Sequence, residues 1–363
     1  MADFSPSVFA ARRERLTDLL AGRALLVSNL VNVRYLTGFS GSNGFLLFSG
    51  SEVQLLTDGR YTTQVAQECP QVPAVIRAVD GTMHQLIAEA FSDFGLKECL
   101  IESGSMTVAM WRELEKSIGQ GVALVDSSNL VENLRAIKDD IELDLIRCSV
   151  RINEQSLLAT IENASPSWSE LQFARHLEQE IRQRAGDGFS FDPIVAAGPS
   201  SALPHYHAGQ PTLGDHDFSL VDWGSSYRGY ASDLTRMLAI GPVPAQIKEI
   251  HSIVSAAKQA AAAEVRAGAE LKSIDEAARN SIAEAGYGEF FNHGTGHGFG
   301  LEIHETPFLS PGREGELKTG MVITIEPGIY LPELGGVRLE DDYLVTATGS
   351  ERLSTLSDDF LSL

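Results

Sequence analysis

Residues 321–345, MVITIEPGIYLPELGGVRLEDDYLV, hold two glutamates inside strand-like apolar runs. Glu326 follows MVITI and precedes Pro-Gly, where a helix cannot continue. Glu340 lies within the run VRLEDDYLV, which we expect to be a strand with Glu340 at its middle. A buried carboxylate is costly unless a counter-charge or a cation accompanies it. The segment therefore predicts a strand-rich domain whose acidic side chains serve a site.

Three more candidate ligands precede this segment. Asp222 in LVDWG and Asp233 in ASDLTR flank a glycine-containing turn, so two antiparallel strands would bring both carboxylates to one face. His297 lies in HGTGHGFG, where glycines allow the backbone to approach a ligand closely. An ion pair with Arg338 is the alternative, but one guanidinium cannot neutralise four carboxylates. Four carboxylates and one imidazole favour a pair of divalent ions over a structural zinc site.

The chain length of 363 residues predicts two domains. Alternating strand and helix patterns up to about residue 127 indicate an α/β domain with a largely parallel or mixed sheet. We place the domains at residues 1–134 and 135–363. Ser167 with Glu170, and Ser273 with Glu276, have the spacing of capping boxes that open two of the helices in the second domain.

Composition restricts the partners and the compartment. Asp plus Glu number 49 against 28 Lys plus Arg, a net charge of −21, which disfavours nucleic acid and anionic membranes as partners. The three scattered cysteines fit reduced thiols. The N-terminus has no apolar signal region, and no apolar run approaches the ~18 residues that span a bilayer. We therefore expect a cytoplasmic protein.

The ordered set LPHYH, VDWG…SDLTR, HGTGHGFGLEIHE, ITIEPGIY and VRLEDD resembles the metallopeptidases of the pita-bread fold. Within that family it is similar to the prolidase and aminopeptidase P branch, which cleaves the bond before proline. The stretches RYLTGFSGSNG and TDGRYTTQ resemble the smaller domain that precedes the catalytic domain there. The resemblance implies an α/β (α+β) chain, with a creatinase-like α/β domain followed by a pita-bread catalytic domain.

The resemblance also implies a dinuclear centre. Asp233 and Glu340 would bridge two divalent ions, Asp222 would chelate one of them, and His297 with Glu326 would hold the other. Glu326 would also act as general base. Manganese is the expected metal, with cobalt or zinc as alternatives.

The remaining roles follow from the same resemblance. His304 would contact the scissile carbonyl, and His293 would line the proline side of the pocket. His205 would line the site and assist proton transfer, with His207 as an alternative that stays open. Arg338 would lie at the substrate site and support the ligand carboxylates.

The implied activity is hydrolysis of Xaa-Pro bonds in proline-containing di- or oligopeptides by a homodimer whose smaller domain limits substrate length. The compact chain favours a dipeptidase (prolidase). HETPFLSP, however, lacks the arginine that some prolidases use for the substrate carboxylate, which leaves aminopeptidase P as the alternative. A non-catalytic binding protein and a metal-free, creatinase-like hydrolase are disfavoured because all five ligands are present.

Overall fold

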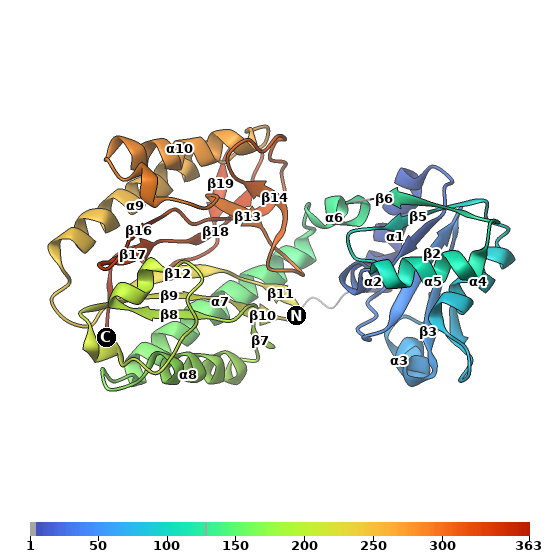
Figure 1. The fold of residues 1–363 in the computed structure, drawn as a ribbon, viewed down its shortest axis with the longest axis horizontal. Helices are drawn as coiled ribbons and strands as arrows, with labels where there is room; N and C mark the ends of the chain where they lie inside the picture. Colours follow the sequence, from blue (N-terminus) through green and yellow to red (C-terminus); the bar gives the residue numbers. More distant parts are fainter. Residues whose placement is uncertain (1–4, 128) are drawn as a thin grey trace. The chain divides into compact units, whose positions relative to one another are not determined.

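The structure, a computed structural model, describes residues 5–127 and 129–363. Residues 1–4, with which the expected N-terminal domain begins, lie outside the described part. The chain separates into two compact units, Met1–Arg135 and Ala136–Leu363 (Figure 1). None of the described helices combines the length and the apolar character needed to cross a membrane.

The N-terminal unit is built on one six-stranded sheet with the order β4-β3-β2-β1-β5-β6. Its strands are β1 Leu25–Val27, β2 Gly44–Ser49, β3 Glu52–Asp58, β4 Ala74–Arg77, β5 Glu98–Glu102 and β6 Ala123–Ser127. Its helices are α1 Pro6–Leu20, α2 Leu30–Thr37, α3 Thr62–Glu68, α4 Met83–Asp93, α5 Val108–Ile118 and α6 Leu130–Arg135. β1, β2 and β3 pair antiparallel, and the outer strands pair parallel. The mixed sheet confirms the predicted α/β class.

The C-terminal unit contains two larger sheets, with the orders β20-β12-β9-β8 and β14-β13-β15-β18-β19. The first consists of β8 Ile194–Ala197, β9 Phe218–Trp223, β12 Leu234–Ala239 and β20 Leu361–Ser362. The second consists of β13 Gly296–Gly298, β14 Glu305–Leu309, β15 Val322–Ile325, β18 Asp341–Val345 and β19 Ser350–Arg352. The smaller strands are β7 Gly188–Phe189, β10 Ser225–Tyr227, β11 Tyr230–Ala231, β16 Gly328–Leu331 and β17 Gly335–Arg338.

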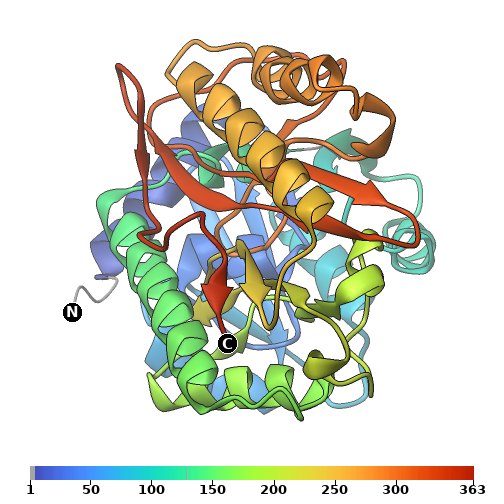
Figure 2. The same cartoon turned by 90° about the vertical axis from the view of Figure 1, so that its left-hand side faces the viewer.

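Helices cover both sides of these strands. They are α7 Asp140–Asn163, α8 Glu170–Gln183, α9 Ala245–Glu264 and α10 Leu271–Glu284. α9 and α10 lie on one side and α7 and α8 on the other (Figures 1 and 2). The apolar stripe of α9, including Ile247, Ile250 and Val254, packs with Ile323 and Ile325 of β15 in one buried core. The sheets are thereby held rigidly, which a precise site requires.

Two helix starts differ from the prediction. α8 is capped by Ser169, whose side chain accepts from the backbone of Gln172, and not by Ser167. Ser273, the other predicted cap, lies inside α10. Both predictions placed the cap at a serine with suitable spacing. In the structure, the residue just before each helix pairs outside it: Ser169 with Thr212 and Glu270 with Glu316, each in an isolated bridge.

Candidate metal centre

Strands β9 and β12 bring the two aspartates together. They pair antiparallel, with Asp222 opposite Thr235, and Asp233 directly precedes β12. The short hairpin of β10 and β11 occupies the connection between them. The predicted antiparallel arrangement is confirmed, and both carboxylates line one cavity of the C-terminal unit.

Glu340 joins the two larger sheets. It lies between β17 and β18, and not in mid-strand as predicted, because its backbone forms an isolated bridge with Thr235. The Thr235 hydroxyl donates to Oε2 of Glu340 at 2.7 Å. This side-chain bond fixes Glu340 beside the strand that follows Asp233.

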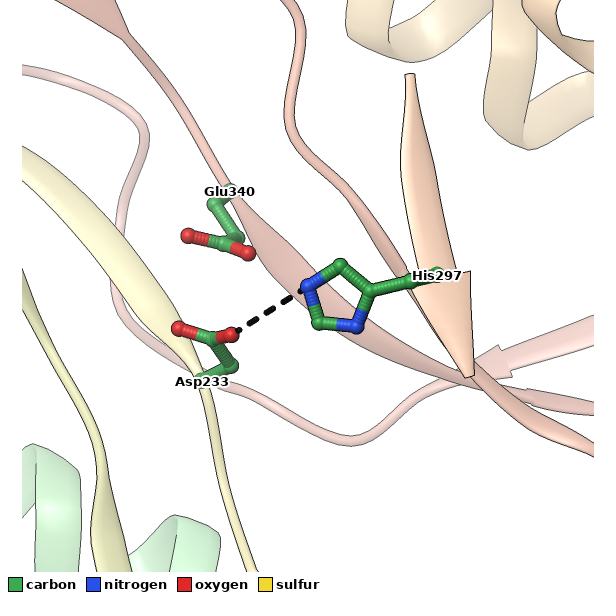
Figure 3. A group of neighbouring side chains, drawn as sticks. All are labelled: Asp233, His297 and Glu340. Atoms are coloured by element: carbon green, nitrogen blue, oxygen red, sulfur yellow. Dashed lines mark ion pairs between the residues drawn. The ribbon is translucent and has the colours of Figure 1, made fainter. Parts of the chain in front are cut away.

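His297, on β13, faces the two carboxylates from the opposite side (Figure 3). Its Nδ1 lies 3.1 Å from the carbonyl oxygen of Gly298. Because a carbonyl oxygen only accepts, Nδ1 carries the proton and Nε2 presents a lone pair. That Nε2 lies 3.4 Å from Oε1 of Glu326 and 3.7 Å from Oδ2 of Asp233.

Three buried side chains form a compact ligand set. One ligand atom from each of Asp233, His297 and Glu340 lies within 4.8 Å of the others. Burial, together with the negative charges of neighbouring carboxylates, raises the pKa of Asp233 and of Glu340 well above the ordinary range. Burial likewise raises the pKa of Glu326. The folded chain therefore holds carboxylates whose charge is poorly compensated by its own residues.

Asp222 provides a direct test of whether these residues fit a metal. Its Oδ2 accepts from Arg338, but Oδ1 is buried without a hydrogen-bond partner among the described residues. Arg338 is 3% exposed and also donates to Thr235 and Tyr330, so its guanidinium is shared among three partners. A buried carboxylate oxygen without a donor costs free energy that a cation would offset. The donor set of oxygens and one imidazole nitrogen fits hard or borderline divalent ions.

The other predicted site residues also line this cavity of about 430 Å³. The rings of His304 and His297 lie 4.5 Å apart. Both ring nitrogens of His293 are engaged, with the Gly294 carbonyl and the Tyr330 hydroxyl. His205 and His207 both line the cavity. The charge of His205 is among the causes that lower the pKa of His304 and of His293, in each case after burial.

Sequence reasoning missed several supporting residues. Thr324 donates to Oε1 of Glu326 and accepts from the backbone of His297. It lies two positions before Glu326, so strand alternation alone would have placed both on one face. Arg313, in contrast, lines the cavity from a loop. A loop has no periodic sequence pattern from which this position could have been predicted.

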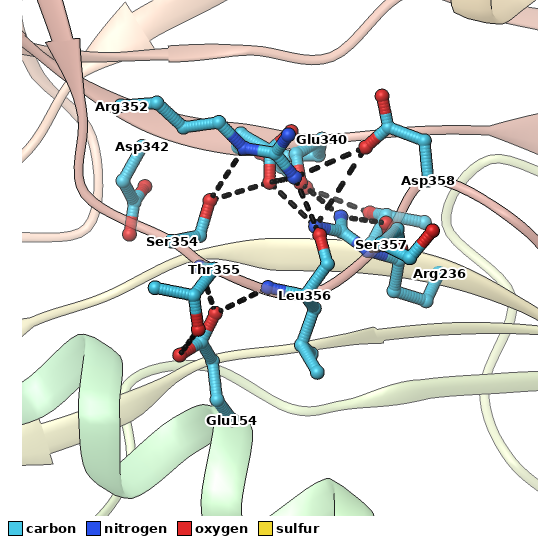
Figure 4. A network of polar contacts seen from close by, with 12 residues as sticks. Glu154, Arg236, Glu340, Asp342, Arg352, Ser354, Thr355, Leu356, Ser357 and Asp358 are labelled. Atoms are coloured by element: carbon cyan, nitrogen blue, oxygen red, sulfur yellow. Dashed lines mark hydrogen bonds and ion pairs between the residues drawn. The ribbon is translucent and has the colours of Figure 1, made fainter.

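A network of buried charges lies behind Glu340 (Figure 4). Arg236, which is not exposed, donates to the Glu340 carbonyl at 2.6 Å and to Asp341 at 2.6 Å. Lys258 and Arg352 also donate to Asp341, and Arg352 donates to the Leu356 carbonyl. The C-terminal segment is thus fastened to the backbone of a candidate ligand.

The chain belongs to metallopeptidase family M24, whose model matches residues 144–347. The model of the creatinase/prolidase N-terminal domain matches residues 12–137. The fold and the family membership predicted from the sequence motifs are both confirmed.

Some of the relatives and solved structures that the chain matches carry names of proline-directed peptidases. The chain is 35% identical over 333 residues to an Xaa-Pro dipeptidase of Pyrococcus horikoshii, covering 91% of this chain and 92% of that one. A solved Xaa-Pro dipeptidase from Bacillus anthracis superposes with a TM-score of 0.92 at 33% identity, covering 99% and 100%. A solved X-Pro aminopeptidase from Thermotoga maritima gives 0.88, also at 33% identity, covering 96% and 100%.

Removal of divalent metal is expected to destabilise the protein. Binding to the folded state alone adds about 2.7 kcal/mol at a metal concentration one hundred times Kd. That corresponds to about 5–10 °C in Tm for domains of ~150–250 residues. Thermal melts with a chelator and with added Mn²⁺ measure the shift, and His297→Gln should lose most of it. Identical melting curves in both conditions would argue against a metal centre.

Proposed function

We propose that the protein is a dinuclear metal-dependent exopeptidase that hydrolyses Xaa-Pro bonds, and specifically an Xaa-Pro dipeptidase. The observation that carries the proposal is the buried set of Asp233, His297 and Glu340, with ligand atoms within 4.8 Å of one another. Asp222 and Glu326 line the same cavity. Manganese, with cobalt or zinc as alternatives, is the metal we assign.

The five ligands divide between two ions. We assign Asp233 and Glu340 to both ions, Asp222 to one, and His297 with Glu326 to the other. Two divalent ions in such a set polarise a peptide carbonyl and make water acidic enough to react at neutral pH. The buried Oδ1 of Asp222, which has no hydrogen-bond partner within the described part of the chain, supports this assignment.

The chain's own groups would move the protons. Glu326 Oε1, which accepts a 3.3 Å hydrogen bond from Thr324, would take the proton of the attacking water. His304 is exposed to the cavity and would donate a hydrogen bond to the scissile carbonyl oxygen. His205 would assist proton transfer to the proline nitrogen, and the ring of His293 would line the proline side. An Xaa-Pro bond has no N–H. The scheme suits such a bond because it requires no hydrogen-bond donor from the substrate.

Two substrates test the activity and separate the candidates. Protein stripped of metal and then supplied with Mn²⁺, Co²⁺ or Zn²⁺ is assayed on Ala-Pro and on Ala-Pro-Ala. Cleavage of the dipeptide alone is the result we expect. Release of alanine from the tripeptide would establish aminopeptidase P instead, and failure to cleave either would favour a binding protein.

Arg313 is expected to favour dipeptides with a free carboxylate. Its guanidinium lies 5.4 Å from the ring centre of Phe308, which pairs with His297 across the sheet and lines the same cavity. Among the described residues no acidic side chain pairs with Arg313. A charged hydrogen bond contributes about 1.5–3 kcal/mol.

Arg313→Ala should therefore raise KM for Ala-Pro by roughly 10- to 100-fold, with little change for the neutral amide Ala-Pro-NH₂. Lys318→Ala is the control, because Lys318 is exposed in the same segment but does not line the cavity. Equal effects on the dipeptide and its amide would remove Arg313 from this role.

We further propose that the N-terminal unit limits substrate length, that the protein acts as a homodimer, and that it works in the cytoplasm on proline-containing peptides. Light scattering coupled to size-exclusion chromatography tests the dimer. A monomer with full activity would overturn that part.

A further inference from the structure

The loop that carries His205 lies along the wall of the cavity. This histidine loop, residues 203–209 (LPHYHAG), lines the cavity with Pro204, His205, Tyr206 and His207. Both histidines are exposed, and within the described ranges neither ring forms a hydrogen bond. The position of the rings therefore depends on how the loop backbone is held.

Glu170, at the start of α8, holds that backbone. It is not exposed to solvent. Its Oε2 accepts from the Tyr206 hydroxyl at 2.9 Å and from the Gly209 amide at 3.0 Å. Its Oε1 accepts from the Ala197 amide at 2.9 Å, at the end of β8. One carboxylate thus ties the histidine loop to the strand that pairs with β9, on which Asp222 lies.

The contacts require a carboxylate in particular. All three partners of Glu170 donate, and an ionised carboxylate is acceptor-only at both oxygens. A glutamine in either orientation would direct its NH₂ group at a donor, leaving at least one buried pair unsatisfied. The first turn of α8 also favours a negative charge through its helix dipole.

We propose that Glu170 is a positioning residue. Through its bonds to Tyr206 and Gly209, it fixes the position of the histidine loop along the cavity. The effect on turnover rests on the proposed function, because it acts through His205. The ring of Tyr206 packs against the apolar core independently of its hydroxyl. Removal of that hydroxyl therefore loosens the loop without removing the packing that holds the fold.

Hydrogen exchange tests the clamp without any reference to activity. Glu170→Gln and Tyr206→Phe should each speed amide exchange at residues 205–210 by about tenfold, the ratio that one lost hydrogen bond gives. The matched controls are Glu154→Gln and Tyr287→Phe. Glu154 is another buried glutamate, which accepts from Thr355 and Leu356 instead. Tyr287 donates to Glu249 in an exposed pair that does not line the cavity.

A double-mutant cycle separates positioning from general stability. Tyr206→Phe should lower kcat/KM for Ala-Pro about tenfold in the wild-type background and have almost no effect in His205→Ala. Equal losses in both backgrounds, or unchanged exchange in the histidine loop, would overturn the proposal. If the wild-type protein cleaves no Xaa-Pro substrate, the proposed function fails, while the exchange experiment still decides whether Glu170 holds the loop.

Discussion

Glu326→Gln is expected to hydrolyse Ala-Pro about 10²- to 10⁴-fold more slowly than the wild-type protein, the range that general-base catalysis contributes. The substitution keeps the shape of the side chain and an oxygen that can accept from Thr324. It removes one negative charge from a cluster in which burial already raises the pKa of Glu326. We therefore expect the metal-free variant to be at least as stable as the metal-free parent.

Metal content decides how the Glu326 result is interpreted. A variant that binds two ions per chain but does not turn over has lost the base, whereas a variant that binds fewer ions has lost a ligand. Glu284→Gln, at an exposed position near the end of α10, is the control for the loss of one carboxylate. Activity within threefold of the parent in Glu326→Gln would remove Glu326 from the role of base.

The places of the candidate ligands in the fold were largely predictable, because buried strands position them. Asp222 follows an apolar run, and strands of this kind are buried, so its carboxylate had to meet a partner inside the unit. Glu326 directly follows the buried strand β15 and meets the same requirement. Glu340 was predicted on the correct segment, but its bridge to Thr235 could not be read from the sequence. Contacts between different sheets depend on packing that no local pattern encodes.

Helix starts were less predictable for a related reason. The spacing of Ser167 and Glu170 suggested a capping box, but the Glu170 carboxylate is used by Ala197 and by the histidine loop. Ser169, the residue immediately before the helix, forms the capping box with Gln172 instead. When a side chain bonds to partners far away in the sequence, it does not take part in the local motif that its spacing suggests.

Arg236→Met is expected to lower the free energy of unfolding by about 3–5 kcal/mol, because it removes one of the cations around Asp341 and the donor to several buried carbonyls. Arg236 donates to the carbonyls of Glu340, Leu356 and Ser357 and to the carboxylate of Asp341 (Figure 4). These bonds connect the C-terminal segment to β12, which Asp233 directly precedes, and to the backbone of Glu340, the other candidate bridging ligand. Urea denaturation monitored by intrinsic fluorescence measures the loss.

A surface pair of the same type provides the control for Arg236. Arg147 donates to Glu351 at 3.0 Å, but their side chains are 40% and 48% exposed. Arg147→Met should cost less than about 1 kcal/mol, since water screens exposed pairs. If Arg236→Met does not fold, Arg352→Met tests the same network, because Arg352 contacts Asp341 and Leu356 from a partly exposed position. Its loss should lie between the other two, and a loss no larger than that of Arg147→Met would mean that the network does not stabilise the site.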